Sequence, residues 1–73
     1  MSQLKILSGK EVCRILEKNG FVQVRQRGSH VVMQKKAEGT TITAIVPIHS
    51  EIRIGTLHSI IRQSRVPREA FEM

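Results

Sequence analysis

The sequence predicts an α+β protein whose elements follow in the order helix, three strands, helix. Apolar residues first recur at helical spacing, then fill three segments rich in β-branched residues, and finally return to helical spacing. The segments between the three predicted strands are short enough for hairpin turns only, so the sheet should be antiparallel. A sheet this small has one face to bury, which two amphipathic helices can cover. We therefore expect a three-stranded antiparallel sheet covered on one face by two helices, formed by residues 1–73 as a single domain.

The first helix is predicted from Gly9 to Lys18. Ser8 and Glu11 have the spacing of a capping box, in which the serine hydroxyl and the glutamate carboxylate each accept a backbone N–H at the start of a helix. Gly20 then offers the left-handed conformation that commonly ends a helix. Between these signals, Val12, Ile15 and Leu16 follow one another at helical spacing and form one apolar stripe.

Strands are predicted in three segments, 21–25, 29–35 and 40–46. Arg27-Gly28 and residues 37–39 provide the turns between them. The second helix is expected over residues 54–63, and a last helical turn over 68–71. Double-stranded RNA-binding domains share this α-β-β-β-α order.

The charge balance indicates an anionic partner. Twelve Lys and Arg residues against six Asp and Glu give a net charge of +6. The positive electrostatic field of such a chain attracts a phosphate backbone, and it would also attract an anionic membrane or an acidic protein. Charge alone therefore narrows the class of partner without naming it.

The apolar segments and the single cysteine bear on location. No apolar run approaches the roughly 20 residues of a membrane span, and the first residues lack the pattern of a signal peptide. Cys13 has no second thiol with which to form an intramolecular disulfide, and we expect it to be a small buried residue of the first helix. The predicted location is the reducing cytoplasm, with no membrane association.

The motifs give no support for a metallohydrolase, an enzyme with a serine nucleophile or an NTPase. The three histidines lack the spacing of metal ligands, and the sequence contains neither a Gly-x-Ser-x-Gly nor a Walker motif. No metal and no small-molecule cofactor is expected.

The chain has no Trp or Tyr, and its two Phe residues are expected in the core, so it cannot stack RNA bases on exposed aromatic rings.

His30 is the most informative candidate for chemistry. It follows the basic segment 25–28 at the start of the second predicted strand, and an imidazole there can accept a proton at neutral pH. RNA supplies its own nucleophile, the 2′-hydroxyl, so one base and nearby cations could suffice for cleavage. By residue type alone, however, a strand histidine beside a turn is more often structural. The sequence also does not show which face of the sheet His30 occupies. Val31 and Val32 are both apolar, so either strand register would place a valine in the core.

Four segments in chain order resemble the HicA (YcfA-like) family of mRNA-interferase toxins from bacterial toxin–antitoxin operons. They are Leu7–Val12, Lys18–Phe21, Arg25–His30, and residues 55–57 with 60–63. The likeness extends from Leu7 to Phe71. It implies a double-stranded-RNA-binding-domain-like fold, cleavage of mRNA without a metal, and a HicB-type antitoxin that covers the active site.

The resemblance also places the family's catalytic histidine, in a Gly-Ser-His run, on His30. On this hypothesis Gly28 and Ser29 shape the turn that aims the imidazole, and nearby cations hold the RNA phosphate. Those cations are Lys10, Arg25, Arg27 and Lys35. His49 matches a Pro-x-His element of many members, and it either assists catalysis or holds the loop after the sheet.

The chain departs from the family pattern at three positions. Val31 stands where many members have a second histidine, Ile54 where a proline is common, and His58 where a cation is common. The general acid is therefore unassigned. Two alternatives to an active toxin stay open, namely a non-catalytic RNA-binding module of the same fold and a degenerate toxin that acts only by binding its antitoxin.

Overall fold

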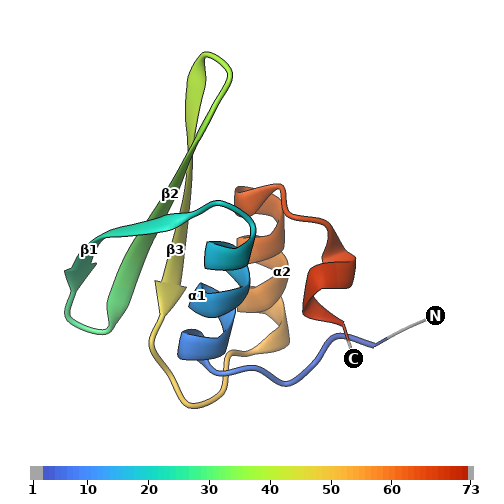
Figure 1. Cartoon of the computed structure of the whole chain (residues 1–73). Helices are drawn as coiled ribbons and strands as arrows, with labels where there is room; N and C mark the ends of the chain where they lie inside the picture. Colours follow the sequence, from blue (N-terminus) through green and yellow to red (C-terminus); the bar gives the residue numbers. More distant parts are fainter. Residues whose placement is uncertain (1–2, 73) are drawn as a thin grey trace.

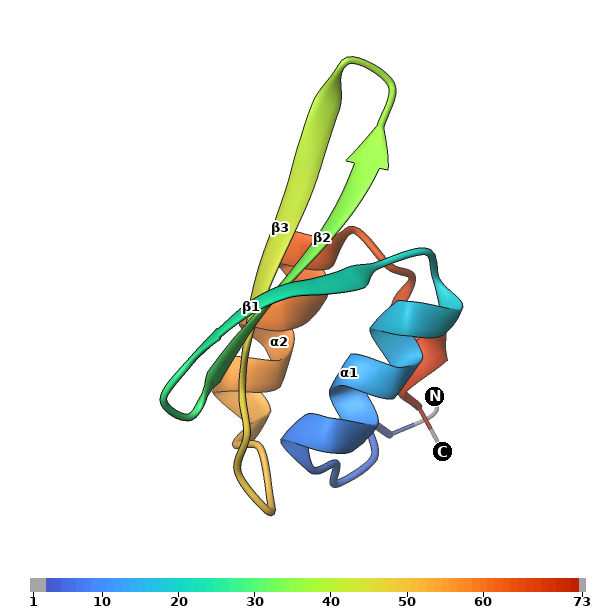
Figure 2. The ribbon, with the colours of Figure 1, turned by 60° about the vertical axis from the view of Figure 1, so that its left-hand side comes forward.

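The computed structural model describes residues 3–72, and its elements follow the predicted order. The elements are α1 (Gly9–Lys18), β1 (Val22–Arg27), β2 (His30–Ala37), β3 (Thr40–Pro47), α2 (Ile54–Ser64) and the 3₁₀ turn η1 (Arg68–Phe71). The strands form one antiparallel sheet in the order β1-β2-β3. Both helices lie on the same side of this sheet, and the β2–β3 hairpin extends past them (Figures 1 and 2). The predicted fold class is confirmed.

The first hairpin turn lies one residue later than predicted. Its two-residue loop is Gly28-Ser29, and Gly28 has a φ of +58°. A two-residue hairpin loop of type II′ needs a positive φ at its first position, which glycine adopts without strain. The prediction of Arg27 in the turn and Ser29 in a strand was therefore wrong. Arg27 instead ends β1, directly opposite His30.

The core lies between the helices and the sheet face that they cover. Phe21 and Phe71 are both buried there, as predicted. Cys13, expected to be buried, is half-buried at the edge of this core. The remaining core side chains are apolar and come from α1, β2, β3, α2 and the segments that join the elements: Leu7, Val12, Leu16, Val31, Met33, Ala44, Val46, Ile52, Leu57, Ile60 and Val66.

The predicted capping box is present at the start of α1. The Ser8 hydroxyl accepts the Glu11 backbone N–H at 3.1 Å, and the Glu11 carboxylate accepts the Ser8 backbone N–H at 2.9 Å. These hydrogen bonds favour the ionised carboxylate and hold the pKa of Glu11 below its ordinary value. The box fixes the residue at which α1 begins, and hence the position of Gly9.

Gly9 is in direct contact with the segment that leaves the sheet. Its backbone N–H donates to the His49 carbonyl at 2.9 Å. A Cβ at this position would overlap the carbonyl oxygen of Pro47 and lie 2.8 Å from the Cα of Ile48. Ile48 in turn donates its backbone N–H to the Ser29 carbonyl at 2.6 Å. One compact contact thus joins the start of α1, the end of β3 and the first hairpin turn, and we call it the Gly9 junction.

Substitution of Gly9 tests this junction. Gly9→Ala should destabilise the protein by about 1–3 kcal/mol. The added methyl group would overlap backbone atoms of Pro47 and Ile48, which can make room only if the whole segment shifts. Gly55→Ala is the matched control, since a Cβ on this glycine of α2 meets no atom within 4 Å. The control should be neutral or stabilising by up to about 1 kcal/mol, as alanine is the better helix former. Urea unfolding of both variants measures the difference, and equal stabilities would contradict the contact.

Candidate active site

The strand register assigns His30 to one face of the sheet. Val31 and Met33 are buried beneath the helices, so the alternating side chains of His30 and Val32 project to the other side. We call this side, which neither helix covers, the open face. The sequence alone did not show on which face His30 lies. The face determines which other side chains can act together with the imidazole.

Two arginines share the open face with His30. Arg27 lies directly opposite His30 on β1, and Arg25 lies opposite Val32, the next position along that face of β2. Residues paired across antiparallel strands project to the same side of a sheet. All three side chains are exposed to solvent. The arrangement therefore places one titratable imidazole beside two permanent positive charges on an accessible surface.

A β-bulge in β1 produces this grouping. Gln23 pairs with Met33 and Arg25 pairs with Val32, so Val24 is an extra residue without a partner. Strict alternation would put residues 23, 25 and 27 on one face. Because of the bulge, Gln23 instead shares the helix-covered face with Gln26, which pairs with Val31. The two arginines are thereby separated from the two glutamines.

The other predicted cations lie on the helix-covered side. Lys10 is exposed in the first turn of α1. Lys35 is half-buried near the other end of β2, about 17 Å from His30 at the rise of an extended strand. Its aliphatic stem lies beside Gly20. The structure therefore brings Arg25 and Arg27 together with His30, and leaves Lys10 and Lys35 on the opposite side.

The turn residues and His49 are linked through their backbones. The Gln26 side-chain amide donates to the Gly28 carbonyl at 3.1 Å, and the Ser29 carbonyl accepts the Ile48 N–H in the Gly9 junction. His49 is the next residue along the chain, and its imidazole is exposed while its carbonyl accepts the Gly9 N–H. The loop is thus held by a backbone atom of His49 that any residue could supply.

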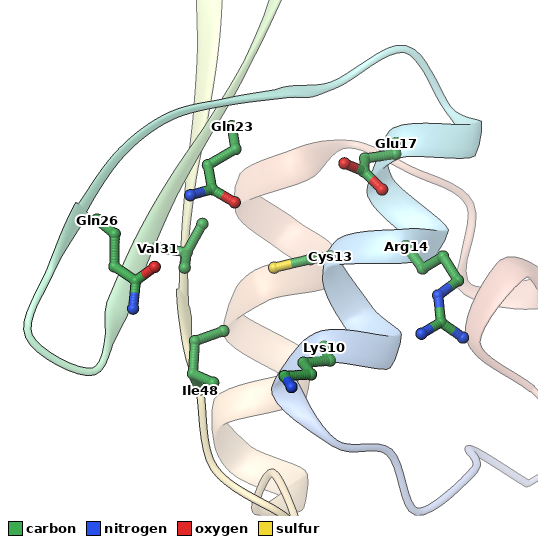
Figure 3. A pocket seen from close by; sticks show the side chains of 8 residues that line it. All are labelled: Lys10, Cys13, Arg14, Glu17, Gln23, Gln26, Val31 and Ile48. Carbon is green, nitrogen blue, oxygen red and sulfur yellow. The ribbon is translucent and has the colours of Figure 1, made fainter.

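A groove lies between α1 and β1, on the side of the sheet away from His30. Its volume is about 340 Å³, and Figure 3 shows side chains from the helix and from the strands facing each other across it. We call it the α1–β1 groove. Its lining residues are Lys10, Cys13, Arg14, Glu17, Gln23, Gln26, Val31 and Ile48.

The groove is lined by four polar residues that were not among the predicted site residues: Arg14, Glu17, Gln23 and Gln26. Arg14 lies one helical turn after Lys10, a spacing that could have indicated a shared face of α1. Gln23 and Gln26 gave no such signal, because a separation of three residues puts side chains of a regular strand on opposite faces. Only the bulge brings the two amides to the same groove.

Cys13 forms part of the groove and is the only cysteine of the sequence. Burial raises the pKa of its thiol, and the nearby negative charge of Glu17 raises it further. The thiol therefore stays protonated at neutral pH. In Figure 3 its sulfur points toward Val31 and Ile48, with which it forms an uncharged surface.

Neither a cluster of metal-ligating side chains nor a membrane-spanning helix is present in residues 3–72. No group of three or more His, Cys, Asp or Glu side chains in this range could hold a metal ion. None of the helices described has the length and apolar character needed to cross a membrane.

The sequence matches the model of a protein family described as HicA toxin of bacterial toxin-antitoxin, over residues 9–66. The match spans most of the 73 residues, so the chain belongs to the HicA toxin family. A member of such a system works with an antitoxin partner. No curated protein matches the chain.

The raised pKa of Cys13 predicts slow chemical modification. At neutral pH the folded protein should react with a thiol-specific reagent several-fold more slowly than the same protein in denaturant, because only the thiolate is nucleophilic. The rate should climb as the pH is raised through and above the range of an ordinary thiol. Mass spectrometry of quenched samples gives both rates. Equal rates for folded and denatured protein at neutral pH would contradict a raised pKa of the Cys13 thiol in the folded protein.

Proposed function

We propose that the protein is the toxin of a type II toxin–antitoxin system, a metal-independent endoribonuclease that cleaves mRNA and is neutralised by a HicB-type antitoxin. Membership of the HicA toxin family supports the toxin role. The observation that carries the catalytic part is the exposed imidazole of His30 opposite Arg27, with Arg25 on the same open face. A base and two cations on one accessible surface are the groups that RNA cleavage by its own 2′-hydroxyl requires.

In the proposed reaction His30 is the general base. Its neutral imidazole takes the proton of the 2′-hydroxyl while the 2′-oxygen forms a bond to the adjacent phosphorus. The bond from phosphorus to the 5′-oxygen then breaks, and that oxygen receives a proton. The products are a 2′,3′-cyclic phosphate and a free 5′-hydroxyl. Arg25 and Arg27 stabilise the negative charge that grows on the phosphate oxygens in the transition state.

His49 is the proposed auxiliary group, which protonates the leaving 5′-oxygen. The hydrogen bond from Ile48 to Ser29 holds the residue before His49 against the residue before His30. The imidazole of His49 is exposed, and the position of the loop depends on its carbonyl rather than on its ring. The ring is therefore available for proton transfer.

The open face also suits the proposed antitoxin. Besides its cations it exposes large apolar side chains, with Val22 59% and Ile45 48% accessible. Exposed apolar residues rimmed by charge are typical of a protein interface. An antitoxin seated on this face would cover His30 and exclude RNA.

Replacement of His30 tests the catalytic assignment. His30→Ala should lower the rate of RNA cleavage by about 10²–10⁴-fold, the usual contribution of a general base. Stability should change by less than about 0.5 kcal/mol, since the side chain is exposed. His58→Ala, which removes another exposed imidazole, on α2, is the matched control and should keep full activity.

The same assay distinguishes the two alternatives. Cleavage that is unchanged in His30→Ala would refute the role of His30. RNA binding without cleavage by the unmodified protein would indicate a non-catalytic binding module. Tight binding of the antitoxin, with neither cleavage nor growth arrest on expression, would indicate a degenerate toxin.

His49 is tested by His49→Ala with a full pH profile. Cleavage should fall by about 100-fold, because protonation of the leaving oxygen is lost, and the decline of the rate at high pH should disappear. The fold should be unaffected, since the substituted residue keeps the carbonyl that binds Gly9. A wild-type rate and pH profile would assign His49 to the structure of the loop alone.

A further inference from the structure

The α1–β1 groove has walls of two different kinds. Residues 10, 13, 14 and 17 lie on one face of α1 and form the helix wall. Gln23 and Gln26 of β1 form the opposite wall, and Val31 and Ile48 lie between the two (Figure 3). At about 340 Å³ the groove has the size of a site for a small molecule or for one residue of a polymer.

The chemistry of these walls matches a nucleotide. The apolar side chains and the neutral Cys13 thiol offer a surface for the flat face of a base. Each glutamine amide carries both donors and acceptors, which can pair with the polar edge of a base. Lys10 and Arg14 supply two positive charges against the single negative charge of Glu17, so the rim of the groove attracts phosphate.

Gln26 is already oriented for such a contact. Its Nε2 donates to the Gly28 carbonyl at 3.1 Å, which fixes the amide plane and leaves the Oε1 as an acceptor. A side chain held in place before binding loses little conformational freedom when a ligand arrives.

The groove and the proposed catalytic group lie on opposite sides of the same hairpin end. Gln26 precedes Arg27 of the open face, and Val31 follows His30. Only the two-residue turn Gly28-Ser29 separates the two sides at this end of the sheet. An RNA strand that crosses this turn would present one phosphate to His30 and a neighbouring base to the groove.

We infer that the α1–β1 groove binds a single RNA nucleotide next to the cleaved phosphate and recognises its base through the amides of Gln23 and Gln26. This inference rests on the proposed function and adds the source of sequence preference to it. The antitoxin is the less suitable occupant, because large exposed apolar side chains that favour a protein partner, such as Val22 and Ile45, lie on the open face.

Cys13 provides a direct probe of occupancy. In the His30→Ala variant, alkylation of this single thiol by iodoacetamide is followed at mildly alkaline pH with and without short 2′-O-methyl oligoribonucleotides, which lack the 2′-hydroxyl needed for cleavage. Bound RNA should slow alkylation about tenfold when its concentration is about ten times its Kd. The protection should weaken as salt is added, because phosphate contacts displace counterions.

Variants separate recognition of the base from general RNA binding. Gln23→Ala combined with Gln26→Ala should reduce by about tenfold the preference for one base beside the cleavage site, read by sequencing the ends of cleaved RNA. Lys10→Ala should weaken protection of Cys13 for every oligonucleotide alike. Gln34→Ala is the matched control, because this amide bonds to Thr43 on the open face and should leave base preference unchanged.

The outcomes distinguish failure of this inference from failure of the proposed function. RNA that binds, or is cleaved, while Cys13 stays fully reactive would place the nucleotide elsewhere and overturn the inference alone. Protection by the antitoxin but not by RNA would also overturn it, as would an unchanged base preference in the double glutamine variant. Absence of both RNA binding and cleavage in the unmodified protein would overturn the proposed function together with the inference.

Discussion

The close approach of Gly9 to the end of β3 is the constraint on which the rest of the structure depends. Three segments that are distant in the sequence meet there through backbone hydrogen bonds, from Gly9 to His49 and from Ile48 to Ser29. The contact leaves no room for a side chain at residue 9. It sets the distance between α1 and the sheet, and with it the width of the α1–β1 groove. It also fixes the first hairpin turn relative to the loop that carries His49.

The elements of the fold could be predicted because each has a local cause. The capping box of Ser8 and Glu11 defines the start of α1, and the β-branched segments define the strands. The faces of the sheet could not be predicted from the same pattern. A β-bulge at Val24 changes which side chains of β1 share a face of the sheet, and no residue in this segment predicts the bulge. The sequence therefore identified Arg25 and Arg27 as candidate partners of His30 but missed Gln23 and Gln26 on the other side.

The small size of the chain explains why the residues that we propose for catalysis and for base recognition occupy both sides of one hairpin. Two helices can cover only one face of the sheet, so the other face keeps exposed apolar and basic side chains. The helices also leave β1 exposed along its whole length. The first hairpin is therefore accessible from both sides, although the rest of the covered face is filled by the core. A hairpin of this kind can present chemistry on one surface and recognition on the other.

The two outer strands of the sheet differ in how they meet solvent. On β3 the outward backbone N–H of Ile45 donates to the Gln63 side chain of α2 at 3.3 Å, and Pro47 has no N–H to offer. On β1 the edge is uncovered, but it bears Arg25 and Arg27. Charged residues and proline on outer strands oppose the edge-to-edge joining of sheets that leads to aggregation. The two arginines that we assign to phosphate would thus also keep free copies of the protein apart, and a substitution that removed their charge would cost solubility as well as affinity for RNA.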